Sequence, residues 1–451
     1  MLERITRFLV NHKLIPVILV IGLTLIGFFT LPLSHQNTLF PSFKVKVDAL
    51  PDLGENQQIV HVSWEGQSPQ DIEDQITYPL TSSLLGISGV KSVRSSSMFG
   101  FCNVYVIFEE DIDFYWARSR ITEKLNALPE NTFPNGVKPR LGPEATALGQ
   151  IFWYTLEGRD AAGNVTGGRD LQEVRTIQDF YVKNTLASTK GVAEVASVGG
   201  FLKEYHVEVD PERMRFHKVA LNQVVQAVQS ANQDMGARTL EINRAEYFVR
   251  GLGQVETLQD LENAIVASNE FTPVFVKDVA RVSLGPAERR GILDKGGAEV
   301  VGGVVSAEYG ENTLVVTERL QESIKRLDKG LPQKTLADGT ISKLTLVPFY
   351  NRSVLIEETL QTLGSALFFE TLIAIFVVFF MMRNLKLSFL VSALVPLAIL
   401  FAFIAMRIFN IEANIVALAG IAIAIGTVVD MGIILAENIS RHLDENPEGN
   451  K

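Results

Sequence analysis

Four long apolar runs and one long polar block dominate the pattern of hydrophobic and polar positions in this chain. The block extends from about residue 34 to residue 358; one apolar run precedes it and three follow it closely. Each run has about 20 residues, the length a helix needs to cross ~30 Å of hydrocarbon. The pattern predicts four membrane-spanning helices, at Leu14–Leu33, Gly364–Met382, Leu387–Phe409 and Asn414–Ala436.

The first run also has a second interpretation, a secretory signal peptide. Its apolar core is longer than that of a signal peptide, and no small-residue cleavage site follows it, so we expect a retained helix. Basic residues lie next to the helix ends that would share one side of the membrane. They are Arg4, Arg7, Lys13, Arg383, Lys386 and Arg441. The positive-inside rule then places both ends of the chain in the cytoplasm and the polar block across the membrane.

Strand and helix patterns alternate in the first part of the polar block. Residues 57–64 (QQIVHVSW) alternate between apolar and polar, as in a half-buried strand. Ser68, Pro69 and Asp71 supply an N-cap, a first-turn proline and an acid, which predicts a helix start. The expected elements follow the order βαββαβ of a ferredoxin-like unit, at Gln57–Trp64, Ser68–Leu85, Gly89–Ser97, Phe101–Glu109, Phe114–Leu128 and Gln150–Leu156.

The alternation then begins again from the Gln150–Leu156 strand, which predicts a second, similar lobe with a subdomain inserted into it. Its expected helices are Leu171–Ser188, Leu221–Asn232 and Asn312–Asp328, and its expected strands are Ala193–Val198, Glu204–Val209, Tyr247–Gly251, Val274–Val282, Val300–Ala307 and Lys343–Tyr350. The predicted fold class is therefore an α+β membrane protein, with four transmembrane helices and a large insert of ferredoxin-like lobes.

Composition narrows the functional classes. A formal net charge of −10 leaves no basic surplus to neutralise phosphates, so nucleic acid is excluded as a partner. A mean hydropathy of +0.18 is typical of a few membrane helices combined with large polar domains. Cys102 is the one cysteine, so the chain has no internal disulfide. The sequence contains neither a nucleophile with its base nor a phosphate-binding glycine loop, so we expect no enzyme and no cofactor.

Carboxylates within the apolar runs are the main candidates for chemistry. Asp430 lies in the middle of the last run, where a charge costs about 2.5–3.5 kcal/mol or more. The commonest reason for such an acid is proton or ion transport, because its neutral form is favoured in hydrocarbon and it can exchange a proton. Glu437 lies two turns further along the same face. It either joins a proton relay or lies at the cytoplasmic interface of the membrane, and we favour the interface. Glu370, in the second run, has either a relay or a structural role.

Two sulfur-bearing residues, Met98 and Cys102, lie four positions apart around a predicted turn. Thioether and thiolate ligands suit Cu(I) and Ag(I), so the pair is a candidate for metal binding. Two donors do not complete a site, and packing within the lobe is the interpretation that we favour. The six histidines do not pair at metal-ligand spacing, so the metal-binding residues stay unknown at this point.

Six segments carry a resemblance to a known family: VDALPDLGENQ (47–57), WEGQSPQDIEDQITYPL (64–80), GVKSVRSSSMFGF (89–101), VYVIFEEDIDFYWARSRI (104–121), LGPEATALGQIFWYTLEG (141–158) and NIVALAGIAIAIGTVVDMGIILAEN (414–438). In order and spacing they resemble the inner-membrane pump of the resistance-nodulation-division (RND) superfamily, in its heavy-metal efflux branch. The resemblance implies a membrane bundle, a porter domain of ferredoxin-like lobes and a docking subdomain. It also implies a homotrimer in the lipid of a bacterial inner membrane, with a large periplasmic domain.

That resemblance implies partners and boundaries as well. The pump would pass its substrate through a periplasmic adaptor (membrane fusion) protein to an outer-membrane channel. The expected divisions are an N-terminal segment with the first helix (1–36), a first porter lobe (37–145), a second porter lobe in two parts (146–203 and 281–358), a docking subdomain (204–280), and three helices with a tail (359–451).

In this family an acid on the fourth helix belongs to the proton relay, and Asp430 matches its position; Glu437 occupies the place of a second acid. The zinc, cobalt and cadmium exporters resemble Asp-Phe-Gly-x-x-x-Asp here. This chain has Ala424 at the first of those positions, which favours the copper/silver type. Family chains are also about twice as long, so we expect a C-terminal half that would carry the partners of Asp430 and the metal-binding methionines.

The predicted function is proton-driven efflux of heavy-metal cations, with copper and silver favoured and this chain as the N-terminal half of a tripartite system. Two alternatives stay open. One is a truncated assembly partner that does not transport. The other is an RND pump for organic amphiphiles, whose relay resembles Val-Asp-Asp, whereas this chain has Val429-Asp430-Met431.

Overall fold

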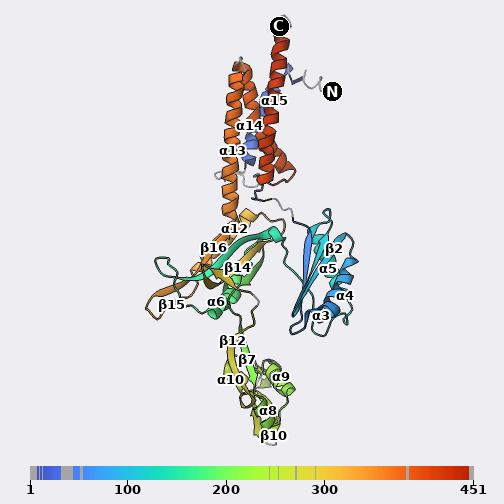
Figure 1. Ribbon diagram of the computed structural model, residues 1–451, viewed down its shortest axis with the longest axis vertical. Coiled ribbons are helices and arrows are strands. Elements are labelled where there is room, and N and C mark those ends of the chain that lie inside the picture. The colour runs from blue at the N-terminus through green and yellow to red at the C-terminus, as the bar shows by residue number, and fades with distance from the viewer. Residues whose placement is uncertain are drawn as a thin grey trace.

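The computed structural model has three tiers along its longest axis (Figure 1). A helical bundle occupies one tier, two β-containing lobes lie side by side in the middle, and a small subdomain lies furthest from the bundle. The structure describes residues 8–9, 11–12, 14–31, 44–50, 54–242, 244–251, 253–269, 272–289, 291–381 and 385–445. The basic residues Arg4, Arg7, Lys13 and Arg383, on which the predicted orientation partly rests, lie outside this described part.

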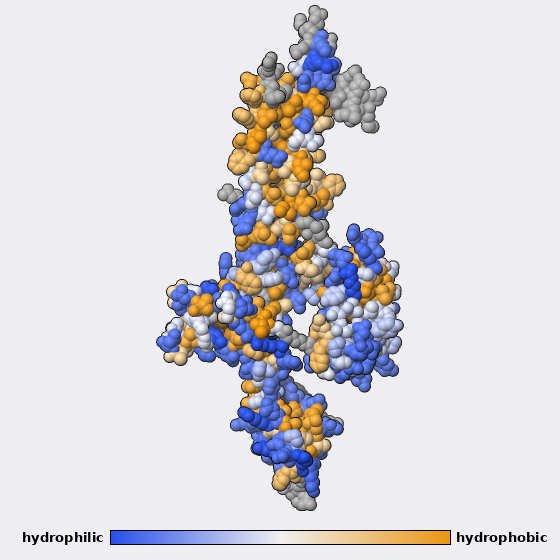
Figure 2. Space-filling view, in the orientation of Figure 1, coloured by the Kyte–Doolittle hydropathy of each residue, from blue (hydrophilic) through white to orange (hydrophobic). Residues whose placement is uncertain are grey.

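Three helices within the described residues are long and apolar enough to cross a membrane: α13 (Arg352–Met381), α14 (Leu385–Ile408) and α15 (Ile415–Glu445). Figure 2 shows that the surface of their bundle is largely hydrophobic, whereas the lobes and the subdomain are mostly hydrophilic. These helices confirm that the chain has membrane-protein character. Their bounds differ from the apolar runs: α13 begins at Arg352 rather than Gly364, because hydropathy detects the part of a helix in hydrocarbon and not its polar ends.

The first predicted span corresponds to the shorter apolar helix α2 (Leu14–Thr30). Its 17 residues would extend about 26 Å, and residues 32–33 of the apolar run lie outside the described residues. This helix packs closely on α14, because a Cβ atom placed on Gly27 would lie only 2.6 Å from Leu400 Cβ. A fourth span therefore stays a prediction.

The first lobe contains a four-stranded antiparallel sheet in the order β2-β3-β1-β4, which is the order of a ferredoxin-like βαββαβ unit. Its elements are β1 (Gln57–Ser63), α3 (Pro69–Ile72), η2 (Glu73–Thr77), α4 (Tyr78–Leu85), β2 (Val90–Met98), β3 (Phe101–Phe108), α5 (Phe114–Asn126) and β4 (Arg140–Leu141). The expected closing strand, Gln150–Leu156, was wrong for this lobe. The closing strand β4 has only two residues, too few to produce an alternating pattern.

The helix start expected at Ser68 is present. The Ser68 hydroxyl accepts a hydrogen bond from the Asp71 backbone N–H at 3.2 Å, and Pro69 occupies the first turn. The helix then includes the π-helical segment η2, which inserts one wide turn between α3 and α4. Hydrophobic periodicity does not reveal such a segment, since Ile72 and Leu80 are buried on either side of it.

The second lobe repeats this arrangement: its main ladder runs β13-β14-β5-β16-β15, and β6 pairs with β14. Its elements are η3 (Ala147–Gly149), β5 (Gln150–Arg159), α6 (Leu171–Ile177), η4 (Gln178–Val182), α7 (Lys183–Ala187), β6 (Val192–Val198), β13 (Leu293–Lys295), β14 (Ala298–Ala307), α12 (Thr313–Asp328), β15 (Gln333–Thr335) and β16 (Ile341–Asn351). Gly89 and Gly191 precede the equivalent strands of the two lobes with φ values of +79° and +91°. The Gln150–Leu156 strand therefore belongs to this second sheet.

The small subdomain is inserted between β6 and β14, where the first lobe has only the short turn between β2 and β3. Its elements are β7 (Lys203–Val209), α8 (Pro211–His217), α9 (Leu221–Ser230), β8 (Met235–Ile242), β9 (Ala245–Gly251), α10 (Leu258–Glu262), β10 (Ile265–Asn269), β11 (Thr272–Phe275), α11 (Val276–Val279) and β12 (Ala280–Pro286). The single strand expected at Val274–Val282 was wrong. It is two strands separated by α11, one helical turn that buries Val276 and Val279.

Candidate functional site

Asp430 lies on the face of α15 that the rest of the bundle does not cover. The opposite face contains the buried residues Leu418, Ile425, Val429 and Ala436, and most of it packs against α13 and α14. Asp430 itself is exposed, as are Gly426 one turn before it and Ile434 one turn after it. In the part of the chain that the structure describes, no hydrogen bond or ion pair reaches the Asp430 carboxylate.

Glu437 is exposed two turns further along the same face of α15, so the spacing argument from the sequence agrees with the helix. Glu370 lies on α13 and is half-buried. The described contacts join none of these three carboxylates to another by a hydrogen bond. The structure therefore shows one acid-bearing helix face rather than an assembled relay.

An uncovered carboxylate on an apolar helix face is expensive when lipid surrounds it, by roughly 2.5–3.5 kcal/mol or more at mid-helix. Membrane proteins reduce that cost by turning the acid toward other helices, toward a water-filled cavity or toward a partner charge. This face of α15, with Asp430 at its centre and the open position Gly426 one turn before it, is suited to receive another helix. Chemically, a carboxylate in such a place can take up and release a proton.

The candidate sulfur pair is not brought together. Cys102 is opposite Ser97 and Met98 is opposite Phe101 in the β2–β3 ladder, so the two side chains leave opposite faces of the sheet. Cys102 is completely buried, whereas Met98 is 51% exposed. Burial also raises the pKa of the Cys102 thiol, which disfavours the thiolate that binds metals. Packing explains Cys102 better than metal binding does.

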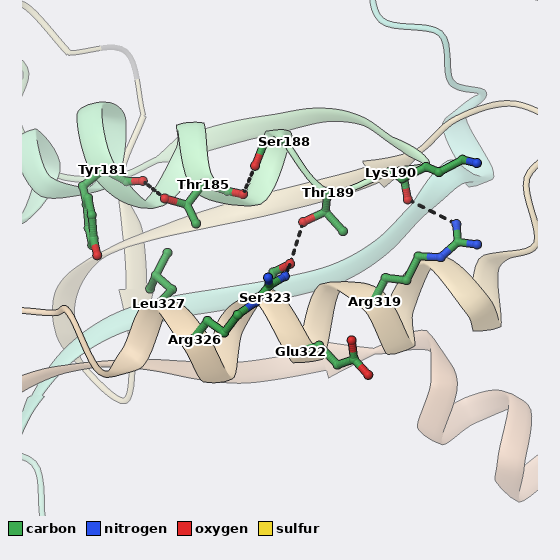
Figure 3. A pocket seen from close by; sticks show the side chains of 10 residues that line it. All are labelled: Tyr181, Thr185, Ser188, Thr189, Lys190, Arg319, Glu322, Ser323, Arg326 and Leu327. Carbon is green, nitrogen blue, oxygen red and sulfur yellow. Dashed lines mark hydrogen bonds between the residues drawn. The ribbon is translucent and has the colours of Figure 1, made fainter.

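A groove of about 590 Å³ lies between α7 and α12 on the second lobe (Figure 3). Hydroxyl side chains line its middle, where Thr189 Oγ1 donates to Ser323 Oγ at 3.0 Å. Its charged residues are mainly cations, Lys190, Arg319 and Arg326, with Glu322 as the one acid in the lining. This charge balance is unsuitable for a metal cation. Nowhere among the described residues do three or more histidine, cysteine or acidic side chains form a group that could hold a metal ion.

Sequence reasoning missed a buried ion pair where the bundle meets the second lobe. Arg352 Nε donates to Asp48 Oδ1 at 2.8 Å, and both residues are buried. The two positions are 304 residues apart in the chain. Neither carried a local signal, because Asp48 falls in a short polar-apolar segment and Arg352 only precedes an apolar run.

Comparisons with known proteins agree with this architecture. The model of the AcrB/AcrD/AcrF family matches residues 5–451. The putative cation efflux system protein SilA of Salmonella typhimurium is 40% identical over 88% of this chain, and the cation efflux system protein CzcA of an Alcaligenes species is 30% identical over 98% of it. A crystal structure of a heavy metal efflux pump superposes with a TM-score of 0.80 and 30% identity over 96% of this chain.

The chain spans only part of each of these relatives: 37% of SilA, 40% of CzcA and 40% of the crystallised pump. The match covers both lobes, the inserted subdomain and the helix that carries Asp430, since it includes nearly the whole chain. The protein belongs to the AcrB/AcrD/AcrF family of RND transporters, in its heavy-metal efflux branch.

Proposed function

We propose that this chain works as the N-terminal part of a proton-driven pump that exports heavy-metal cations across the inner membrane. The observation that carries the proposal is Asp430, an exposed carboxylate at the centre of an apolar helix face. The rest of the pump would cover this face and supply its partner charge, since the chain spans about 40% of the relatives' length. Asp430 would then load a proton on one side and release it on the other.

Glu437 and Glu370 have lesser roles in this proposal. Glu437, two turns beyond Asp430 on the same face, would exchange protons with the cytoplasmic side. Glu370 on α13 would either join the relay or hold a neighbouring helix. The metal-binding residues would lie mainly in the part of the pump beyond this chain, as the family resemblance implies. Among the described residues, no three histidine, cysteine or acidic side chains form a group that could hold a metal ion.

Copper and silver are the cations that we favour. Identity to the cation efflux system protein SilA, at 40%, exceeds identity to the cobalt-zinc-cadmium resistance protein CzcA of Cupriavidus metallidurans, at 30%, which disfavours cobalt, zinc and cadmium. Ala424 supports the same choice, because it occupies the position where the zinc, cobalt and cadmium exporters resemble an aspartate. Such soft cations prefer sulfur ligands, which methionines elsewhere in the pump would supply.

Partners and assembly follow from the family. The pump would be a homotrimer in the inner membrane, linked by a periplasmic adaptor to an outer-membrane channel. The porter lobes (37–145, and 146–203 with 281–358) would form the substrate path in the periplasm, and the inserted subdomain (204–280) would face the channel. The subdomain's position furthest from the bundle supports this role (Figure 1).

The test is a resistance profile of a metal-sensitive bacterial strain expressing the complete pump as wild type, Asp430→Asn or Asp111→Asn. Asp111 is a matched control, because it is an exposed acid on a lobe loop outside the bundle. We expect the wild type and Asp111→Asn to confer resistance to copper and silver salts, and Asp430→Asn to confer none at equal membrane abundance.

Three results would count against this reading. Full resistance with Asp430→Asn would refute the relay. Protection against dyes and detergents, but not against metals, would favour a pump for organic amphiphiles. No resistance from the wild type, together with its co-purification with other pump subunits, would favour a non-transporting assembly partner.

A further inference from the structure

The Asp48 carboxylate is fully engaged by donors at the junction between the bundle and the second lobe. Oδ1 accepts from Arg352 Nε at 2.8 Å and from the Ala49 backbone N–H at 2.6 Å. Oδ2 accepts from Thr313 Oγ1 at 2.9 Å. Arg352 also donates through Nη1 to the carbonyl oxygen of Leu148, just before β5. One ion pair thus connects four separate segments of the chain.

Both charged side chains of this pair are buried, which costs desolvation free energy. Arg352 is 5% exposed and Asp48 is 9% exposed. Desolvating two charges costs several kcal/mol per ion, and apolar side chains of similar volume often stabilise a fold equally well. A buried pair is therefore weak evidence for stability alone, and a role in holding one specific geometry explains it better.

Backbone contacts tie the Asp48 segment to the start of α15. Val47 forms a parallel β-bridge with Ala413, and Ala413 N donates to the Lys46 carbonyl at 2.8 Å. Ile415, the first residue of α15, donates from its backbone N–H to the Ala49 carbonyl at 3.3 Å. Asp430 is 15 residues further along this continuous helix, about 22 Å from its start.

The other side of the pair belongs to the second lobe. Arg352 is the first residue of α13 and directly follows β16, which pairs with β5 in the lobe's sheet. Thr313 is the first residue of α12, the long helix that packs on that sheet. A shift at the start of α15 must therefore either move both elements or break the hydrogen bonds to Asp48.

The surroundings leave room for such a shift. A cavity of about 360 Å³ adjoins the pair and is lined by Asp48, Arg352, Thr313, Tyr309 and Asn414, among others. On the membrane side the same segment packs into an apolar cluster through Val45 and Val47, with residues of α13, α14 and α15. We call this junction of Asp48, Arg352, Thr313 and the start of α15 the joint. It has an open cavity on the side of the second lobe and tight apolar packing on the side of the bundle.

We propose that Asp48 and Arg352 are positioning residues that transmit movement between α15, which carries Asp430, and the second lobe. The inference rests on the proposed function. It explains how a movement of α15 that accompanies proton exchange at Asp430 would reach the periplasmic lobes. The pair would keep the α15 start, α12 and α13 moving as one body, so that proton exchange and cation movement stay coupled.

The test uses the complete pump reconstituted in liposomes, in which proton uptake and silver-ion export are measured together. Asp48→Asn keeps the shape and removes the charge, and Thr313→Val removes one donor but keeps the pair. Glu157→Gln is the matched control, since Glu157 is a buried acid paired with Lys295 and Arg159 inside the second lobe, away from the joint. It reports what the loss of a buried ion pair does by destabilisation alone.

We expect Asp48→Asn to export silver roughly 2- to 30-fold more slowly than wild type, and to admit protons when no metal is present. Thr313→Val should show a smaller change in the same direction. Glu157→Gln should keep the wild-type ratio of protons to silver ions. A wild-type ratio in Asp48→Asn, or an equal loss of coupling in Glu157→Gln, would overturn the proposal.

A measurement independent of transport separates this inference from the proposed function. Spin labels at Glu318 on α12 and at Ile411 in the turn before α15, both exposed, report the distance across the joint. The distance distribution should broaden in Asp48→Asn and not in Glu157→Gln. A wild type that exports no metal would refute the proposed function. Unchanged distances in Asp48→Asn would refute the proposal that Asp48 and Arg352 couple α15 to the second lobe. Should Asp48→Asn fail to reach the membrane, Thr313→Val provides the same two readouts.

Discussion

Replacing Glu157 by glutamine should destabilise the second lobe measurably. The carboxylate belongs to β5 and its side chain is 4% exposed. Oε1 accepts from Lys295 Nζ and from Thr155 Oγ1, both at 2.5 Å, and Oε2 accepts from Arg159 Nη2 at 2.9 Å. The bond from Lys295 holds the β13–β14 hairpin against β5, in the middle of the sheet.

The expected cost follows from what the amide leaves unsatisfied. Glutamine keeps one acceptor, so one of the two cations faces an NH₂ group instead of an oxygen. Breaking a fully buried pair costs about 3–5 kcal/mol, but Lys295 and Arg159 are 38% and 30% exposed and can partly rehydrate. We therefore expect a loss of about 2–3 kcal/mol, which lowers Tm by roughly 5–10 °C for a domain of this size.

The loss should depend on pH with a definite sign. Burial raises the pKa of Glu157, but the hydrogen bonds from Lys295, Thr155 and Arg159 outweigh it and hold the pKa below the ordinary value of 4.5. A carboxyl whose pKa is lower in the folded state stabilises the fold above the unfolded value, and this stabilisation disappears as the pH falls through the folded value. The difference between wild type and Glu157→Gln should therefore be full above pH 4.5 and shrink in stronger acid.

Thermal unfolding of the detergent-solubilised protein, followed by circular dichroism over a series of pH values, measures this difference. Glu173→Gln is the control, because Glu173 pairs with Lys334 at 3.3 Å and both side chains are more than 40% exposed. Such a surface pair contributes at most about 1 kcal/mol. Equal Tm values for wild type and Glu157→Gln at neutral pH, or a difference that stays constant into acid, would contradict the reasoning.

Two further predictions concern the bundle and the first lobe. Gly27→Leu should force α2 away from α14, because a Cβ atom there would lie 2.6 Å from Leu400 Cβ, whereas Gly22→Leu should be tolerated, because no atom lies within 4 Å of its Cβ position. Cysteine cross-linking between the two helices in membranes measures this, and equal cross-linking in both variants would contradict it. Cys102 should resist alkylation by iodoacetamide at pH 8 in the folded protein and react once urea unfolds the lobe, because burial removes access and raises the thiol pKa. Rapid labelling of the native protein would show that the lobe opens.

Local patterns were enough to locate most of the secondary structure. The apolar runs predicted α13, α14 and α15, and the Ser68 cap predicted the start of the helix that begins with α3. Strand alternation predicted the β2–β3 hairpin and the repeat in the second lobe. It missed β4 because two residues have no period, and it merged β11 and β12 because α11 is a single turn with buried valines.

The candidate site shows the same division between local and long-range information. Asp430 stands out in the sequence because a charge in an apolar run violates the solvation rule for membrane helices. The face on which it lies depends on how α13 and α14 pack against α15, and spacing alone does not decide that. Met98 and Cys102 are only four positions apart in the sequence, yet the pairing register directs their side chains to opposite sides of the sheet.

The sequence by itself determined the class of this protein, the membrane helices α13, α14 and α15, its repeated lobes and the acid in the middle of its last apolar run. These properties depend on hydrophobicity and backbone preference, which act over a few residues. Only the tertiary structure decided that Asp48 and Arg352, 304 positions apart, meet in a buried pair that joins α15 to the second lobe. Such a contact depends on the path of the whole chain, so the sequence around either residue does not predict it.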